Sequence, residues 1–163
     1  MTGGRAIPSR APAVPDKGSA AGFSALTLGY QGRTLEEVLE IIRAERVQEV
    51  LDVRERAASK KPGFSGPELM RTLAVMGVEY VHLASLGCTY AARHALWRSK
   101  VTEPFFEEYR RHLETRAEAV QDLVDRVRNS RCLLLCLERD PSRCHRSVLA
   151  EKLRAEGISI QDL

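Results

Sequence analysis

The sequence predicts a three-layer α/β fold, in which a mostly parallel sheet of about five strands has helices on both faces. Apolar runs alternate along the chain with amphipathic segments, which is the order of strands and crossover helices in a parallel sheet. The run CLLLCL at 132–137 is apolar throughout, as expected for a strand buried on both faces. A length of 163 residues, with 44% hydrophobic and 29% charged residues, fits one globular domain.

The first half of the ordered chain contains the signals of three strands and two helices. The strands are apolar runs bounded by turns, and they lie at 25–30, 47–53 and 78–83. A Thr or Ser followed three residues later by Glu forms a capping box that begins each helix, at Thr34 and at Ser65. Apolar residues at helical spacing continue the first helix to about Glu45, and Gly77 is a natural end for the second.

The second half is expected to add two helices and two strands. A stripe of apolar residues predicts one long helix from about Glu103 to Asn129. The buried strand at 132–137 follows, and a further helix runs from about Cys144 to Glu156. Residues 158–163 form a short strand or tail. The segment 84–100 has no clear pattern, so we assign it neither to a helix nor to a loop.

The N-terminal segment differs in composition from the rest of the chain. Residues 1–24 hold three of the seven prolines, four of the eleven glycines and no periodic apolar face. We therefore predict a disordered tail at 1–24 and a single α/β domain at 25–163. The tail carries +2 of the formal net charge of +3, so the domain is almost neutral. A basic site in the domain must be a local cluster.

Composition also argues against membrane and disulfide-scaffold classes. No apolar run approaches the roughly 18 residues that cross a bilayer, and the N-terminus has no signal-peptide core. We therefore expect a cytoplasmic protein with no membrane partner. The cysteines, at 88, 132, 136 and 144, are too few for a disulfide scaffold, and we expect thiols, ligands or packing groups.

Polar side chains follow the predicted strands at the ends that share one sheet edge. In open α/β sheets, ligands bind beyond the carboxyl ends of the strands. Those ends carry Tyr30, Gln31, Asp52, Arg54, His82, Cys136 and Glu138. We therefore expect the functional site at this edge of the sheet.

The segment CLERDPSRCHR at 136–146 is the densest in reactive groups. It leaves the buried strand with C-x-E and begins the next helix with C-H-R. The N-terminus of a helix carries a partial positive charge, which attracts anions and lowers the pKa of a nearby thiol. Cys144 is therefore a candidate thiolate, and Arg143 and Arg146 are candidate anion-binding residues.

These motifs resemble the domain of unknown function 488 family. The blocks TLGYQGRTLEE, EVLDVRE, KKPGFS, GVEYVHLASLG and LLLCLERDPSRCHRSVLAEKL look like its signature blocks in the same order, over residues 26 to about 160. The resemblance implies a three-layer α/β domain with no general activity assigned. The family's motif residues map onto Gly29, Tyr30, Gly32, Arg33, Asp52, Arg54, Pro62, Gly63, Phe64, Cys136, Glu138, Cys144, His145 and Arg146.

The chain departs from the family pattern at two places. Similar members usually read GYEGR where this chain has Gln31, and Leu-Pro is common where Arg56 and Ala57 stand. If the missing acid is a base or a ligand in relatives, that role is altered or lost here.

A zinc site is one chemistry that suits the cysteines of 136–146. Its ligands would be Cys136, Cys144 and His145, with Cys88 or His82 as the fourth. The C-x7-C gap is not a usual zinc spacing, and free cysteines are often simply buried. From the sequence we therefore assign no metal ligand and no cofactor.

A thiol nucleophile is the second chemistry, with either cysteine as the nucleophile and His145 or Glu138 as the base. Neither cysteine begins the C-x5-R cradle of phosphatases and rhodanese-type sulfurtransferases. Adjacent side chains on a helix diverge by about 100°, so we expect His145 to turn away from Cys144 and Glu138 to be the better partner. The alternative for Glu138 is an ion pair with Arg54 or Arg146 that only ties loops together.

The loop RERAASKKPGFSG at 54–66 is strongly basic. Its charged residues are Arg54, Glu55, Arg56, Lys60 and Lys61. Such a loop can grip phosphates, with Phe64 stacking on a nucleotide base. A solvated charged loop is the alternative. We expect Trp97, His94 and His112 to be packing or surface residues.

The main hypothesis is an enzyme that acts on a phosphorylated or nucleotide-linked anion at the carboxyl edge of the sheet. The candidate catalytic residues are Cys136, Glu138, Cys144, His145 and Asp52. The candidate ligand-binding residues are Tyr30, Gln31, Arg33, Arg54, Lys60, Lys61, Phe64, Arg143 and Arg146. The alternatives are a non-catalytic nucleotide or nucleic-acid binding module and a zinc-binding structural site. No oligomeric state follows from the sequence.

Overall fold

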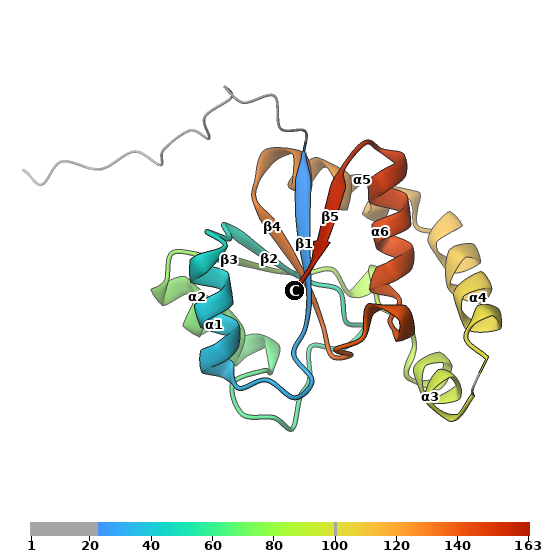
Figure 1. Ribbon diagram of the computed structural model, residues 1–163, viewed down its shortest axis with the longest axis horizontal. Coiled ribbons are helices and arrows are strands. Elements are labelled where there is room, and N and C mark those ends of the chain that lie inside the picture. The colour runs from blue at the N-terminus through green and yellow to red at the C-terminus, as the bar shows by residue number, and fades with distance from the viewer. Residues whose placement is uncertain (1–22, 100) are drawn as a thin grey trace, which may run out of the picture.

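A computed structural model describes residues 23–99 and 101–163 (Figure 1). The tail predicted at 1–24 falls outside these ranges except for Phe23 and Ser24, and Ser24 begins the first strand. No helix in the described ranges is long and apolar enough to span a bilayer.

The centre of the fold is a five-stranded parallel sheet in the order β3-β2-β4-β1-β5. Its strands are β1 (Ser24–Gly29), β2 (Glu49–Asp52), β3 (Glu79–His82), β4 (Cys132–Cys136) and β5 (Ser159–Asp162). Every residue of the central β4 is buried, as its continuous apolar sequence predicts. The predicted mostly parallel sheet is therefore confirmed, and the segment expected as a strand or a tail at 158–163 pairs with β1.

Within residues 23–99 and 101–163, six helices complete the three layers. They are α1 (Leu35–Ala44), α2 (Gly66–Val75), α3 (Tyr90–Arg98), α4 (Glu103–Glu114), α5 (Ala117–Asn129) and α6 (Arg146–Ala155). Helices α1 and α2 lie on one side of the sheet, and α4 and α6 lie on the other (Figure 1). The core is divided in the same way, because side chains of α1 and α2 form one buried cluster and those of α4, α5 and α6 form a second. The three-layer α/β fold is thus confirmed.

The two predicted capping boxes begin α1 and α2. Thr34 and Glu37 exchange hydrogen bonds, since Glu37 N donates to Thr34 Oγ1 at 3.2 Å and Thr34 N donates to the Glu37 carboxylate at 2.6 Å. Ser65 and Glu68 form the second box. Reciprocal bonds of this kind satisfy the backbone donors that a helix leaves unpaired at its start.

The long helix predicted over 103–129 is wrong. The chain forms two helices instead, and Thr115 and Arg116 interrupt them. Residues 114–118 are all exposed, so no buried side chain holds this stretch in a continuous helix. The apolar stripe appears unbroken in the sequence because both helices bury the same kind of face against the sheet.

The start of the last helix also differs from the prediction. A single 3-10 turn at Pro141–Arg143 follows β4, and α6 begins at Arg146 rather than at Cys144. Asp140 caps the turn by accepting a hydrogen bond from Ser142 N at 2.9 Å. The unassigned segment 84–100 contains a 3-10 turn at Ala84–Leu86 and helix α3.

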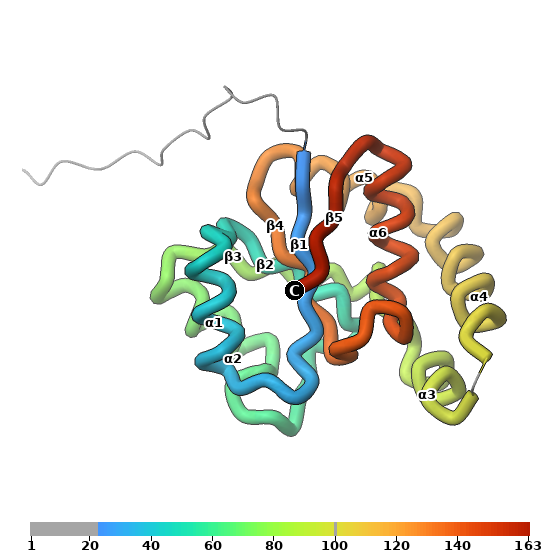
Figure 2. The backbone as a smooth tube through the Cα atoms, in the orientation of Figure 1, coloured from blue at the N-terminus to red at the C-terminus, as the bar shows by residue number. Residues whose placement is uncertain are grey.

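The connections that leave β1, β2 and β4 gather at one end of the sheet, together with α3 (Figure 2). Strands β1 and β4 are neighbours in the sheet. The chain continues from β1 to β2, which lies beyond β4, and from β4 to β5, which lies beyond β1, so the two connections run in opposite directions. Ligands of open α/β sheets bind in the crevice formed where such outgoing connections separate. The topology therefore places the expected site above the ends of β1 and β4.

Gly29 allows the ends of β1 and β4 to approach closely, and its replacement is the first testable prediction. A Cβ atom at Gly29 would lie 1.8 Å from the carbonyl oxygen of Glu138. We expect Gly29→Ala to lower the free energy of unfolding by more than about 2 kcal/mol, because backbone must move to relieve the overlap. Urea denaturation followed by circular dichroism measures this change.

Gly77→Ala is the comparison for that variant. Gly77 has a φ of 71° and no atom within 4 Å of an added Cβ, so only the left-handed backbone opposes alanine. We expect a cost of about 1 kcal/mol there. A Gly29→Ala protein as stable as Gly77→Ala would show that the close approach of β1 and β4 is not required.

Candidate functional site

The backbone ladder between β1 and β4 continues past the strands into the site. Tyr30 N donates to Cys136 O at 3.1 Å, and Gln31 N donates to Leu137 O at 2.8 Å. Arg139 N donates to the Gln31 side-chain oxygen at 3.3 Å. These bonds hold Gln31 and Glu138 on neighbouring segments of the carboxyl edge.

Asp52 and Arg54 form a buried ion pair at the end of β2. One carboxylate oxygen of Asp52 accepts from Arg54 Nε at 2.8 Å, and the other accepts from Arg54 Nη2 and from Tyr80 Oη, the latter at 2.7 Å. Arg54 Nη1 donates to Tyr30 Oη and to Phe64 O, both at 3.0 Å. Burial lowers the pKa of Arg54, but Asp52 raises it by more, so the guanidinium stays charged. The pair thus joins β2 to β1, β3 and the basic loop.

This network bears on the roles expected for Asp52, Arg54 and Phe64, which stay predictions. All three are buried, and every side-chain nitrogen of Arg54 already donates to a protein oxygen. Four of the five guanidinium N–H groups of Arg54 are used in these bonds. The Phe64 ring stacks on Tyr30 with centroids 4.3 Å apart, so it offers no open face to a nucleotide base. The basic loop is folded onto the sheet rather than held over it as a lid.

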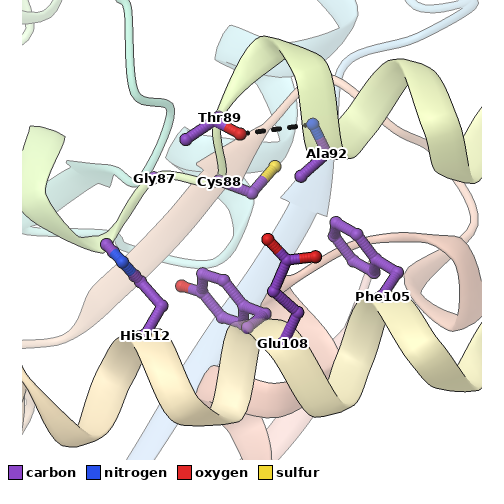
Figure 3. Close-up of a pocket in the computed structure, with 8 residues that line it drawn as sticks. Gly87, Cys88, Thr89, Ala92, Phe105, Glu108 and His112 are labelled. Atoms are coloured by element: carbon purple, nitrogen blue, oxygen red, sulfur yellow. Dashed lines mark hydrogen bonds between the residues drawn. The ribbon is translucent and has the colours of Figure 1, made fainter.

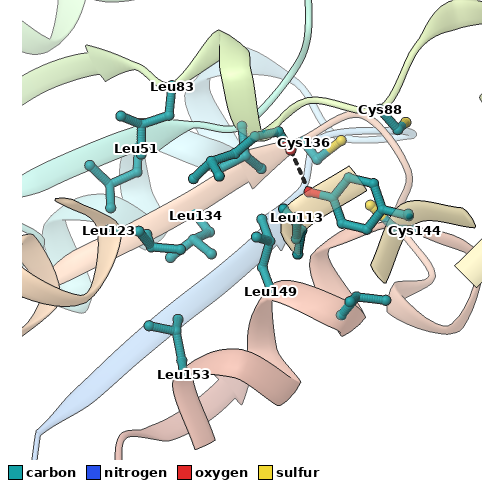
Figure 4. Close-up of a cluster of buried hydrophobic side chains, with 14 of the residues drawn as sticks. Leu51, Leu83, Cys88, Leu113, Leu123, Leu134, Cys136, Cys144, Leu149 and Leu153 are labelled. Atoms are coloured by element: carbon teal, nitrogen blue, oxygen red, sulfur yellow. Dashed lines mark hydrogen bonds between the residues drawn. The ribbon is translucent and has the colours of Figure 1, made fainter. Parts of the chain in front are cut away.

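Cys136, Cys144 and His145 bring their side chains together beside the end of β4. Their sulfur atoms and one ring nitrogen all lie within 4.8 Å of one another. His145 Nδ1 is 4.0 Å from Cys136 Sγ and 3.9 Å from Cys144 Sγ. Figure 4 shows the sulfurs of Cys136 and Cys144 at one end of a buried cluster, with Cys88 nearby.

His145 faces Cys144, contrary to the expected divergence of adjacent helical side chains. Cys144 has an extended backbone (φ −135°, ψ 139°), and His145 is the residue before α6 rather than part of it. The 100° rotation per residue of a helix therefore does not separate them. His145 Nε2 lies 2.8 Å from Val53 O, which can only accept, so Nε2 carries a proton and Nδ1 faces the sulfurs.

The charges of this cluster are strongly coupled. Burial raises the pKa of the Cys144 thiol, but a hydrogen bond from Cys136 and the charge of His145 bring it well below its ordinary value. Burial lowers the pKa of His145, but Cys144 and then Cys88 raise it well above its ordinary value. The hydrogen bond with Cys144, followed by burial, raises the pKa of Cys136. The opposed shifts favour a thiolate on Cys144, stabilised by His145, over a thiolate on Cys136.

Cys132 differs from the other two cysteines of 132–144. It begins β4 and is fully buried, and its Sγ lies 3.8 Å from Glu49 Oε2. It does not belong to the group in which the cysteine and histidine ligand atoms converge. Burial raises the pKa of its thiol to about 12, so it remains neutral. Cys132 is a packing residue, as the sequence suggests.

Glu138 lies between the thiols and the outside of the fold. Its Oε2 atom is 3.1 Å from Cys136 Sγ and 3.4 Å from Cys144 Sγ. Burial, followed by the charge of Cys144, raises the pKa of the Glu138 carboxyl. The expected ion pair with Arg54 or Arg146 is not formed. Glu138 instead faces Arg93, with Oε1 and Nε 3.9 Å apart, and both of these buried atoms lack a hydrogen-bond partner.

Arg146 is a structural cation rather than an open anion-binding residue. It is 2% exposed, and its guanidinium donates to Glu138 O at 2.6 Å, to Thr27 Oγ1 at 3.0 Å and to Cys144 Sγ at 3.3 Å. These contacts join β1, the turn after β4 and α6. Each of its three nitrogens donates to a protein group, and the anion-binding role expected for Arg146 stays a prediction.

Two cavities flank the Arg93–Glu138 contact. One of about 330 Å³ is lined by Gln31, Trp97, Glu138, Asp140 and Arg143. A neighbouring one of about 180 Å³ is lined by Tyr30, Arg54, Glu55, Arg56, Ala58, Tyr90, Arg93 and Leu137. The larger volume reaches the lower end of the range found for small-molecule sites.

Helix α3 supplies the site residues that sequence reasoning missed. The Arg93 guanidinium lies 5.7 Å from the ring centroid of Tyr90 and 5.4 Å from that of Trp97. Trp97, expected to be a packing or surface residue, lines the larger cavity beside Glu138. The spacing of 90, 93 and 97 places one arginine between two aromatic residues on a single helix face. This pattern is the sequence signal from which the contribution of α3 could have been predicted.

Some of the other candidate ligand-binding residues line a cavity, and others do not. Gln31 and Arg143 line the larger cavity, and Tyr30 lines the smaller one. Lys61 Nζ donates to Tyr30 O at 3.3 Å and lies over the Phe64 ring. Lys60 is exposed, and Arg33 has a buried Nε without a partner. Neither of these last two residues lines a cavity described above.

A third, smaller cavity lies between α3 and α4 and is lined mainly by apolar atoms (Figure 3). Its volume is about 50 Å³, and Cys88, Phe105, Glu108 and His112 are among its lining residues. Tyr109, which lines it too, packs edge-on against His145 with ring centroids 5.1 Å apart. Through Tyr109, this cavity therefore adjoins the Cys–His cluster.

Comparison with known proteins identifies the family but no better characterised relative. The family model described as "Domain of unknown function DUF488" matches residues 34–153, which include the Cys–His cluster, Glu138 and α3. No curated protein and no solved structure matches the chain. Because the match covers more than half of the chain, the protein belongs to the DUF488 family.

Proposed function

We propose that this protein is an enzyme that acts on a small phosphorylated or nucleotide-linked anion in the cavity beside Glu138. The observation that carries the proposal is the contact of Arg93 Nε with Glu138 Oε1, which are 3.9 Å apart, buried and without hydrogen-bond partners. Buried polar atoms in native proteins are nearly always paired. A donor and an acceptor left free beside a cavity are therefore suited to a ligand that bonds to both.

The chemistry of the cavity favours an anion. Arg93 can donate to a phosphate oxygen in a charge-assisted bond, and Arg143 lines the same cavity as Glu138. Apart from Glu138, the acids that line the two neighbouring cavities are already engaged. Asp140, in the larger cavity, caps the turn after β4, and Glu55, in the smaller one with Arg93, accepts from Tyr90 N at 3.2 Å. Two arginines are therefore offered to a ligand, while two of the neighbouring carboxylates are occupied by the protein.

Glu138 is the side chain placed to exchange a proton with that ligand. It is the only one of the candidate acid–base residues that lines a described cavity, whereas Asp52, Cys144 and His145 are buried behind it. Arg93 would hold the anionic group, and Trp97 would lie against the organic part of the molecule. Asp52 and Arg54 shape the site by fixing the surrounding loops.

Binding is tested through Trp97, which is the single tryptophan of the chain and lines the cavity. Titration with adenosine monophosphate, and with inorganic phosphate as a second probe, is expected to change the fluorescence of Trp97. Arg93→Gln should weaken binding by about tenfold or more, because one charge-assisted hydrogen bond to phosphate is lost. Arg98→Gln, an exposed position on the same helix, should bind as the wild type does.

Turnover is tested separately by phosphorus NMR of nucleotides and phosphate monoesters incubated with the protein. Glu138→Gln should retain adenosine monophosphate binding and lose turnover, because the amide cannot exchange a proton. Binding without any turnover would favour the non-catalytic nucleotide module. Strongly salt-dependent binding of an oligonucleotide, in place of the mononucleotide, would favour the nucleic-acid module. No fluorescence response to either probe would contradict the proposed site.

A further inference from the structure

We propose that Cys136, Cys144 and His145 form a zinc-binding site with three protein ligands. The site lies directly behind Glu138, at the junction of β4 and α6. Two thiolates and one imidazole are ligand types that zinc prefers. Zinc binding does not depend on the enzymatic activity proposed above, and the two can fail independently.

The separations of the ligand atoms suit one ion. Zinc bonds of about 2.3 Å to sulfur and 2.0–2.1 Å to nitrogen, arranged as a tetrahedron, place sulfur and nitrogen ligands roughly 3.6 Å apart. In the structure, His145 Nδ1 is 4.0 Å from Cys136 Sγ and 3.9 Å from Cys144 Sγ. All three ligand atoms lie within 4.8 Å of one another. Each sulfur–nitrogen separation therefore needs to shorten by only a few tenths of an ångström to bind the ion.

The surroundings orient the ligands as the outer shell of a metal site does. His145 Nε2 donates to Val53 O at 2.8 Å, and this directs Nδ1 toward the two sulfurs. A metal-bound histidine usually donates its other ring N–H to a carbonyl or a carboxylate in this way. Arg146 Nε donates to Cys144 Sγ at 3.3 Å, and this bond stabilises the sulfur as a thiolate. Packing alone does not require either orientation.

Cys132 is a buried cysteine of β4 that has no such orienting partners. It is also buried on β4, and among the described residues its sulfur has a hydrogen-bond contact with the Glu49 carboxylate, at 3.8 Å. Among the described residues, the Cys–His group at 136–145 is the one in which several metal-ligating atoms converge. Cys132 is therefore a matched control for the proposed ligands.

Glu138 adjoins the fourth position of the site. Its Oε2 atom is 3.1 Å from Cys136 Sγ and 3.4 Å from Cys144 Sγ, but the carboxylate does not belong to the group of atoms that lie within 4.8 Å of one another. We assign the fourth position to a water molecule that donates a hydrogen bond to Glu138. Three protein ligands with one position left to water are typical of catalytic rather than structural zinc.

Zinc affinity is measured on the reduced, metal-free full-length chain by competition with a chromophoric chelator. One Zn²⁺ per chain is expected to bind. Cys144→Ser and His145→Gln should each weaken the affinity at least about a hundredfold, since outer-shell changes alone cost about ten- to a hundredfold. Cys132→Ser should leave the affinity unchanged. Equal losses in Cys132→Ser and Cys144→Ser would overturn the assignment.

Cobalt provides a second measurement that needs no variant and so does not depend on the folding of one. Co²⁺ bound to the wild-type protein should give the visible bands of a tetrahedral centre and a near-ultraviolet thiolate-to-cobalt band. Addition of Zn²⁺ should abolish both. A cobalt spectrum without the thiolate band would overturn the proposal, even if the adenosine monophosphate titration supports the proposed function.

Discussion

Replacing Asp52 by Asn is expected to lower the free energy of unfolding by about 3–5 kcal/mol. The substitution keeps the size of the side chain but removes its charge, so the guanidinium of Arg54 is left buried without a counter-charge. Both residues are at most 2% exposed, and each oxygen of Asp52 accepts hydrogen bonds. Because a guanidinium is too basic to lose its proton near neutral pH, the arginine cannot escape this cost by becoming neutral. Urea denaturation followed by circular dichroism measures the loss.

An exposed ion pair is the control for the Asp52 variant. Glu151 contacts Arg110 at 3.1 Å, and their side chains are 50% and 36% exposed. Glu151→Gln should therefore change the stability by at most about 1 kcal/mol. If Asp52→Asn costs no more than Glu151→Gln, the buried network does not hold the loops together. Asp52→Asn should also lower the affinity for adenosine monophosphate, because the loops that shape the smaller cavity meet at Arg54.

Replacing Arg146 by Met is expected to lower the free energy of unfolding by about 3 kcal/mol. Methionine fills much of the space but leaves Glu138 O and Thr27 Oγ1 without their donor, at about 1–3 kcal/mol for each buried unpaired group. Arg146→Lys should recover only part of the stability, since one ammonium cannot reach three acceptors in the fixed geometry of a guanidinium. Arg128→Met, which removes a surface pair with Glu156, should cost at most about 1 kcal/mol.

Arg146 is also expected to act on the metal site without touching the metal. Its bond to Cys144 Sγ stabilises the thiolate, so Arg146→Met should weaken zinc binding by about ten- to a hundredfold. Arg146→Lys should restore part of the affinity. A folded Arg146→Met protein that binds zinc as tightly as the wild type would limit Arg146 to a structural role.

Much of the fold was predictable because its signals are local. Capping boxes and apolar periodicity operate over three or four residues, and they located α1, α2 and the strands within a few positions. The division of 103–129 into α4 and α5 was not predictable in this way. It depends on whether residues near Thr115 find buried partners, and the apolar stripe on either side does not reveal that.

The side chains of the candidate site gather at the sheet edge that the sequence indicates, and their roles stay predictions. Cys136, Glu138, Cys144 and His145 come together at the expected edge of the sheet. The contribution of α3 was missed, because no periodic signal assigned residues 84–100 to a helix. Arg93 therefore replaces Arg54 and Arg146 as the arginine with an unpaired donor beside Glu138.

The sequence by itself determined the α/β class, the parallel sheet and the sheet edge where the polar motifs gather. Only the tertiary structure decided which of those polar groups are already occupied. Arg54 is held by Tyr30 and His145 by Val53, and these partners lie 24 and 92 residues away along the chain. A donor is free or occupied according to what the fold brings to it. Local spacing identifies the chemical types at a site, whereas long-range contacts determine which of them remain available to a ligand or a metal.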